Sequence, residues 1–180
     1  DNDNKENTSN TVSGNNVIKN NNVESGKEEM SKMVKENSNL PVVYMSKYNE
    51  EDSVLKDYKY VDNYMSDDFY GDDIFFSYYG YPNDEADFYL GKIELKTNKY
   101  NLFGVTVGDN FNQAIEKLEK FGFERKSAAQ RSDAEFTYKD FTISIDRSIP
   151  KPYRQLEESE YTVGTISIEA DSEYLGNLIY

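Results

Sequence analysis

The stretch GVTVGDNFNQAIEKLEKFG, residues 104–122, decides the fold class of this 180-residue chain. A short apolar strand runs into a Gly-Asp-Asn turn, and Asn110 with Gln113 then has the spacing of a capping box. Gly122 stands where a left-handed residue ends many helices. The pattern predicts a helix over residues 110–121, and its apolar face consists of Phe111, Ala114, Ile115, Leu118 and Phe121.

The residues that follow this helix alternate between apolar and polar side chains in the three segments 136–139, 141–146 and 163–169. Alternation of this kind is typical of an antiparallel sheet with one dry and one solvated face. The apolar face of the helix is the natural cover for the dry face. We therefore expect an α+β fold, in which an antiparallel β-sheet has one or two helices packed on one face.

Upstream of the helix, residues 74–96 have the pattern of a β-hairpin. A β-rich segment, 74–79, is followed by a loop of turn-forming residues and by the alternating segment 88–96. The stretch 54–65 is ambiguous, because its apolar residues fit a helical face while Tyr58 and Tyr60 alternate as in a strand. Here we expect a helix.

Two segments of the chain resemble each other. FYLGKIELK, residues 88–96, aligns without gaps on YTVGTISIE, residues 161–169: each has an aromatic residue, an aliphatic residue, a glycine and two branched apolar residues. The offset from residue 88 to residue 161 suits two related αβ modules, which we take as a further expectation. Chance similarity of two amphipathic strands is the alternative.

The order of these motifs resembles a known fold. The motifs are Y-x-G-x-I-x-L, G-V-x-V-G-D, a capped helix ending in F-G, Y-K-D-F-x-I-x-I and G-x-I-x-I, within residues 89–169. They resemble the modules of the β-lactamase-inhibitor-protein-like fold, the outer-membrane lipoproteins of the SmpA/OmlA type and lipoproteins of Gram-positive bacteria. The chain departs from that pattern at residues 122–124, where Gly-Phe-Glu replaces Gly-x-Pro. The resemblance implies a non-catalytic, extracytoplasmic protein that binds another protein, and it carries over no functional residues.

Composition excludes several classes of function. The chain has no cysteine and no histidine, so a Cys/His zinc site, a cysteine nucleophile and a Ser-His-Asp triad are ruled out. A net charge of −14 would repel nucleic acid. No apolar run is long enough to form a transmembrane segment. We expect no enzyme activity, no cofactor and no metal site.

Residues 1–39 differ in composition from the rest. They are rich in Asn, Ser, Lys and Glu, and the first aromatic residue is Tyr44. We expect a disordered polar tail or linker over residues 1–39 and a single α+β domain over residues 40–180. One short helix inside the tail, with Met30, Met33 and Val34 on one face, is the alternative.

The start of the chain bears on location. Because it begins at Asp1 without Met, we expect a processed or a truncated form, and removal of a targeting segment is one way to produce it. Flexible polar tails of this kind often tether a domain to a surface, here with a membrane tether supplied by a removed N-terminal segment as one option. The expected location is extracellular or at the cell surface.

Tyrosines and acids coincide in one stretch. Residues 48–89 contain nine tyrosines, and residues 50–87 contain twelve acids against two lysines. Tyrosine offers a large, rigid contact area with a polar tip, and neighbouring acids favour a basic protein partner. We expect the partner-binding surface at Tyr70, Asp72, Asp73, Tyr78, Tyr79, Tyr81 and Asp84. If it is not there, the open sheet face carrying Thr142, Ser144, Thr165 and Ser167 is the next candidate.

Other functions stay open beside protein binding. The tyrosines could instead be half buried in the sheet beneath a solvated acidic face. A cell-wall or carbohydrate-binding module that uses the same tyrosines is the main alternative function, with Ca²⁺ as a possible requirement. The carboxylates that could hold Ca²⁺ surround Gly71, although their spacing is not that of an EF-hand: Asp67, Asp68, Asp72 and Asp73. A small hydrolase is a third class, suggested only by the abundance of acids.

Overall fold

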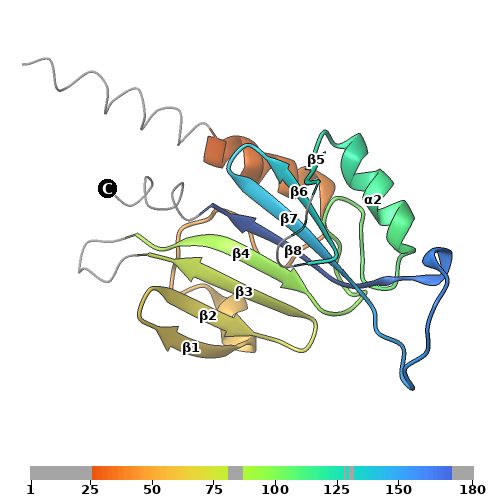
Figure 1. Cartoon of the computed structure of the whole chain (residues 1–180). Helices are drawn as coiled ribbons and strands as arrows, with labels where there is room; N and C mark the ends of the chain where they lie inside the picture. Colours follow the sequence, from red (N-terminus) through yellow and green to blue (C-terminus); the bar gives the residue numbers. More distant parts are fainter. Residues whose placement is uncertain (1–25, 81–86, 128, 130–131, 172–180) are drawn as a thin grey trace, which may run out of the picture.

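The computed structural model describes residues 26–80, 87–127, 129 and 132–171. Eight antiparallel strands form one open sheet in the order β1-β2-β3-β4-β8-β7-β6-β5 (Figure 1). The strands are β1 (Lys59–Asn63), β2 (Ser66–Tyr70), β3 (Ile74–Tyr79), β4 (Tyr89–Leu95), β5 (Glu124–Arg125), β6 (Ala134–Tyr138), β7 (Phe141–Arg147) and β8 (Val163–Ala170). Short 3₁₀ turns, η1 (Ser53–Asp57) and η2 (Glu158–Glu160), precede β1 and β8. The expected α+β fold is confirmed.

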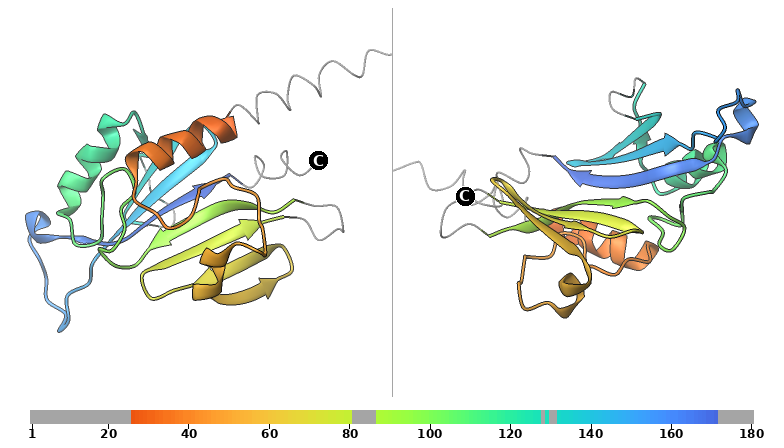
Figure 2. Two further views of the ribbon diagram at one scale, coloured as in Figure 1. Left: turned by 180° about the vertical axis from the view of Figure 1, so that it is seen from behind. Right: turned by 90° about the horizontal axis from the view of Figure 1, so that it is seen from below.

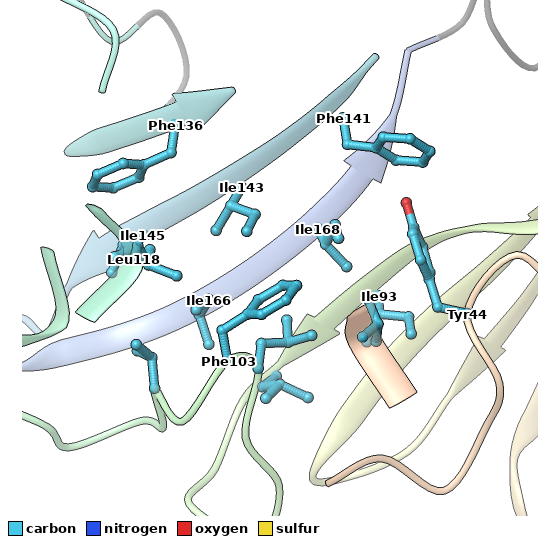
Figure 3. Close-up of a cluster of buried hydrophobic side chains, with 14 of the residues drawn as sticks. Tyr44, Ile93, Phe103, Leu118, Phe136, Phe141, Ile143, Ile145, Ile166 and Ile168 are labelled. Carbon is cyan, nitrogen blue, oxygen red and sulfur yellow. The ribbon is translucent and has the colours of Figure 1, made fainter. Parts of the chain in front are cut away.

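The two α-helices of the described residues lie on the same face of the sheet. The helix at residues 26–37 and α2 (Phe111–Lys120) lie in front of the strands when the molecule is seen from behind (Figure 2, left). Alternate strand residues point toward them and form the core, together with Leu118 of α2 and Phe103 (Figure 3). Five strand isoleucines of this core are 0% exposed: Ile93, Ile143, Ile145, Ile166 and Ile168.

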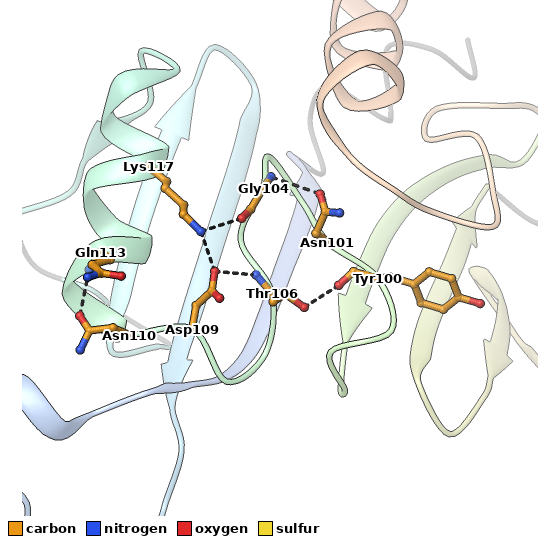
Figure 4. Close-up of polar contacts among 8 residues, drawn as sticks. All are labelled: Tyr100, Asn101, Gly104, Thr106, Asp109, Asn110, Gln113 and Lys117. Atoms are coloured by element: carbon orange, nitrogen blue, oxygen red, sulfur yellow. Dashed lines mark hydrogen bonds and ion pairs between the residues drawn. The ribbon is translucent and has the colours of Figure 1, made fainter.

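The helix α2 begins and ends as its sequence predicts. The Asn110 side chain accepts a hydrogen bond from the backbone N–H of Gln113 at 3.2 Å, and Gly122 follows the helix with a φ of 87°. The Lys117 ammonium lies 2.8 Å from a carboxylate oxygen of Asp109 in the loop before the helix (Figure 4). Of the five residues expected on the apolar face of the helix, Phe121 is 37% exposed. The other four are buried: Phe111, Ala114, Ile115 and Leu118.

The sheet consists of two four-stranded meanders that meet at β4 and β8. Ile93 pairs with Ile168, and Leu95 pairs with Ile166. In the alignment of the two similar segments, Ile93 corresponds to Ile166 and Leu95 to Ile168. If each residue is replaced by its counterpart in the other strand, the pair Ile93–Ile168 becomes the pair Ile166–Leu95, which is also present. A local two-fold axis between β4 and β8 would produce this relation. In sequence, one α-helix precedes each meander, and this order together with the symmetry supports the expectation of two related αβ modules.

Residues 26–39 are part of the folded domain, although the sequence led us to place its start at residue 40. Met30 and Val34 are 0% and 1% exposed, and Ser38 Oγ accepts a hydrogen bond from the backbone N–H of Phe103. The alternative of a short amphipathic helix is the one that the structure bears out. Few apolar residues suffice because the helical spacing puts all of them against the sheet. Residues 1–25 lie outside the described residues.

The helix expected over residues 54–65 is wrong beyond residue 57. After the single turn η1, the chain extends into β1, and Val61 pairs with Asp68 of β2. The alternation of Tyr58 and Tyr60 was the correct signal. The neighbouring strand β2 was not expected, because Asp67 and Asp68 are unfavourable in strands.

Candidate binding surface

The face of the sheet opposite the helices carries polar and aromatic side chains. Within the described part of the chain, no helix covers this face (Figures 1 and 2). Cross-strand pairing arranges its central residues in two rows. We call this surface the open face and define it by Tyr70, Phe75, Glu94, Ser167 and Ser144 in the first row and Lys92, Glu169 and Thr142 in the second.

An aromatic pair forms one end of the first row. The rings of Tyr70 and Phe75, on adjacent strands, have centroids 4.9 Å apart. Tyr70 is 40% exposed, and the Lys96 ammonium lies 5.8 Å from its ring centroid. Burial and the nearby Asp68 carboxylate raise the pKa of Tyr70. The pair offers a partly dry contact area with a polar tip.

A carboxylate beside this pair is held in place from three sides. Asp68 is 9% exposed and accepts hydrogen bonds from Asn63 Nδ2 at 2.6 Å, from Ser77 Oγ and from the Tyr70 hydroxyl at 3.5 Å. Ser77 is 1% exposed, so its hydroxyl supports Asp68 and is not an accessible nucleophile. Asp68 therefore contributes a fixed negative charge next to the aromatic pair.

The remaining charges of the open face are partly paired. The Lys92 ammonium lies 3.5 Å from a carboxylate oxygen of Glu169 on the adjacent strand β8. Glu94, in the next row of β4, is half-buried and lies between Phe75 and Ser167. Exposed cross-strand ion pairs of this kind contribute little stability, so a ligand could displace them at small cost.

Three of the expected partner-binding residues lie at the end of the sheet where β2 turns into β3. Tyr70 is on the open face, and Asp72 is exposed in the turn. Asp73 instead accepts a hydrogen bond from Thr97 Oγ1 at 2.7 Å and pairs with the Lys99 ammonium at 2.9 Å. The contacts with Lys99 and Thr97 lower the pKa of Asp73.

Tyr78 and Tyr79 lie at the other end of β3. Tyr78 points into the core and is 3% exposed, with its ring 5.3 Å from that of Tyr48, so it cannot belong to a binding surface. Tyr79 is on the side of the open face but is four residues from Phe75 along β3, or roughly 14 Å at the rise of a strand. The expected residues thus divide between two ends of the sheet, and Tyr81 and Asp84 lie outside the described residues.

The four carboxylates around Gly71 do not gather at one point. Adjacent strand residues point to opposite faces, so Asp67 lies on the helix-covered side, where it accepts a 2.6 Å hydrogen bond from the Tyr60 hydroxyl. Asp68 is on the open face, and Asp73 is engaged by Lys99. In the described ranges, no group of three acidic residues is placed to hold a metal ion.

The alternative surface that the sequence indicated forms the middle of the open face. Thr142, Ser144 and Ser167 lie on its two rows, and Thr165 donates a hydrogen bond to Asp146 at 3.1 Å. Strand alternation was the signal that located them. The same alternation places Lys92 and Glu94 opposite Ile93 and Leu95, and the structure adds Phe75 and Glu169 to this face; none of the four was among the predicted binding residues.

Comparisons with known proteins add no functional assignment. No family model, curated protein or solved structure matches the chain. The resemblance to the β-lactamase-inhibitor-protein-like and SmpA/OmlA-type modules therefore stays a prediction. Neither of the helices at residues 26–37 and 111–120 has the length and apolarity required to cross a membrane.

Proposed function

We propose that this is a non-catalytic protein that binds another protein through the open face. One observation carries the proposal: a continuous sheet face that no helix of the described residues covers, with the half-exposed Tyr70–Phe75 pair at one end. The strands hold these side chains in fixed positions, so little conformational entropy is lost when a partner docks. Aromatic residues supply most of the binding energy where an interface excludes water.

Charge favours a basic partner. The chain has a net charge of −14, and residues 50–87, which include β1 to β3, contribute −10 of it. Carboxylates such as Asp68 and Glu94 on or beside the open face would speed the encounter with a positively charged surface. The expected salt dependence is a slower association at high ionic strength, with a smaller change in dissociation.

The proposal also places the protein outside the cytoplasm, at the cell surface. The support is the tether-like composition of residues 1–25 and the resemblance to lipoprotein modules. Surface biotinylation of intact cells tests this part. Labelling only after lysis would contradict it and leave the binding proposal unaffected.

The experiment compares proteins captured from the source's envelope fraction by two matched double variants. Ser144→Arg with Ser167→Arg places two bulky side chains in the centre of the open face. Glu116→Arg with Glu119→Arg makes the same number of changes to arginine on the exposed side of α2. A genuine partner is retained by the wild type and the α2 variant and lost by the open-face variant. Equal retention by both variants would overturn the proposal.

Salt and ligand type distinguish protein binding from carbohydrate binding. Stacking of a neutral sugar on Tyr70 and Phe75 would change little with ionic strength, whereas binding to a basic protein would weaken. Co-sedimentation with purified cell-wall polysaccharide supplies the comparison. Salt-insensitive sedimentation that is lost in Tyr70→Ala would favour the carbohydrate-binding module instead.

A further inference from the structure

Strand β1 is a sheet edge with one neighbour. Among the described residues it pairs only with β2. The opposite edge, β5, consists of two residues, whereas β1 consists of five. Edge strands are usually protected by proline, a bulge, charged side chains or a covering segment, because their free backbone groups can pair with another chain. Of these protections, β1 has two charged side chains, Lys59 and Asp62. The register of β1 with β2 is regular, and its sequence, Lys-Tyr-Val-Asp-Asn, contains no proline.

The free backbone groups of β1 can be assigned from the neighbouring strands. In an antiparallel ladder, alternate residues of a strand bond to one side and the others to the opposite side. The N–H of Gly71 donates to Ile74 O, so the odd-numbered residues of β2 bond toward β3 and the even-numbered ones toward β1. The backbone N–H and C=O groups of Asp68 therefore bond to those of its cross-strand partner Val61. The N–H and C=O groups of Tyr60 and Asp62 consequently point away from the sheet.

The side chains around these groups favour a positively charged strand. Tyr60 is 49% exposed, and Asp62 is exposed on the same side of β1. Exposed acids lie before η1 and at its end, among them Glu50, Glu51 and Asp57. The turn η1 lies over β1 and β2 in Figure 2. Together with Asp62, these acids outnumber the exposed lysines of the same stretch, Lys56 and Lys59. A second copy of the chain would bring another charge of −14 to this edge, so like charges oppose β1–β1 pairing.

We infer that β1 accepts a basic, extended peptide segment as an additional antiparallel strand. The backbone groups of Tyr60 and Asp62 supply the hydrogen bonds, as in other cases of strand addition. A lysine or arginine opposite Asp62 forms a cross-strand ion pair, and the aliphatic stem of a second one, two residues along the added strand, covers the Tyr60 ring. This edge is distinct from the open face, and the inference does not depend on the function proposed for that face.

The direct test is amide exchange in the whole chain with a synthetic peptide. The probe is a hexapeptide of alternating lysine and valine, blocked at both ends, and its glutamate–valine counterpart is the charge control. The lysine peptide should slow exchange at the Tyr60 and Asp62 amides and leave that of Val61, which is already bonded to β2, unchanged. Protection elsewhere, or none, would overturn the inference. So would protection of the same two amides without peptide in a concentration-dependent dimer.

Two changes at one position separate backbone pairing from charge attraction. Asp62→Asn keeps the N–H and should weaken peptide binding a few-fold, with a smaller salt dependence. Asp62→Pro removes the outward N–H, which edge strands tolerate, and should weaken binding at least tenfold at every salt concentration. Equal effects of the two variants would mean that charge alone attracts the peptide.

A modified peptide keeps the test decisive if the proline variant does not fold. The same lysine–valine peptide, N-methylated at every residue, cannot donate to β1 from either edge but keeps all of its charges. Against the wild-type chain it should bind at least tenfold more weakly than the unmodified peptide. Binding of equal strength would refute strand addition. The open-face arginine variant should bind the unmodified peptide as the wild type does.

Discussion

Gly91 and Gly164 occupy equivalent positions in the two central strands of the sheet. In β3–β4 the register passes from Ser77–Lys92 to Tyr78–Leu90 and leaves Gly91 unpaired. In β7–β8 it passes from Asp146–Thr165 to Arg147–Val163 and leaves Gly164 unpaired. Each meander therefore carries one β-bulge at the same place. The shared bulge extends the two-fold relation of β4 and β8 to the strands on either side.

The bulge at Gly164 should not accept a side chain. A Cβ atom there would lie 2.9 Å from both Arg147 O and Ser148 N, which are backbone atoms and cannot move independently. We expect Gly164→Ala to lower the free energy of unfolding by about 1–3 kcal/mol, measured by urea denaturation. Ser167→Ala, three residues along the same strand, is the control and should stay within about 0.5 kcal/mol. Equal values for the two would mean that β8 adjusts without strain.

The packing of the helix at residues 26–37 gives a second prediction. Met30 is fully buried, so Met30→Ala should cost about 2–5 kcal/mol of unfolding free energy. Lys32→Ala on the exposed side of the same helix should cost less than about 0.5 kcal/mol, although it removes a 3.9 Å ion pair with Glu36. A negligible effect of Met30→Ala in thermal or urea unfolding would mean that residues 26–39 act as a linker and do not stabilise the domain.

Local patterns were sufficient to predict most of the fold. Asn110, Gly122 and the spacing of Leu118 identify α2, and the alternation around Ile143 identifies its sheet. The strand order depended on long-range pairing that no local pattern encodes. The strand β2 shows why: Asp67 and Asp68 oppose strand formation locally, but each carboxylate is satisfied by a side chain from a neighbouring strand, Tyr60 or Ser77.

The candidate site was less predictable than the fold. Tyrosine content pointed to the half of the sheet that contains β1 to β4, but composition cannot distinguish Tyr70 on the surface from Tyr78 in the core. The difference follows from strand parity, since residues 70 and 75 pair on one face and residues 76 and 78 point to the other. That parity requires the register of β2 with β3, and β2 itself was not recognised.

Buried tyrosines should make the fold sensitive to alkali. Burial raises the pKa of Tyr78 to about 12, and burial with the Glu169 charge raises that of Tyr79 to about 12. Unfolded tyrosine has a pKa near 10, so between about pH 10 and 12 the native state holds protons that the unfolded state has lost. Stability should therefore fall as pH rises through this window. Tyr78→Phe should flatten the fall in urea midpoints measured from pH 9 to 12, and an unchanged slope would contradict this.

Tyr70 and Tyr78 provide a matched pair for separating stability from binding. Tyr78→Ala empties a core position, so it should cost about 3–5 kcal/mol of unfolding free energy. Tyr70→Ala removes a half-exposed ring and should leave the fold intact, with a cost below about 1 kcal/mol. If the open face binds a partner, Tyr70→Ala should speed its dissociation, because aromatic contacts at a dry interface mainly determine the off-rate. The measurement is surface-immobilised binding to a partner identified by the arginine variants, with the α2 double variant as control. An unchanged dissociation rate would mean that the aromatic pair contributes little binding energy and that the main contacts lie near Ser144 and Ser167.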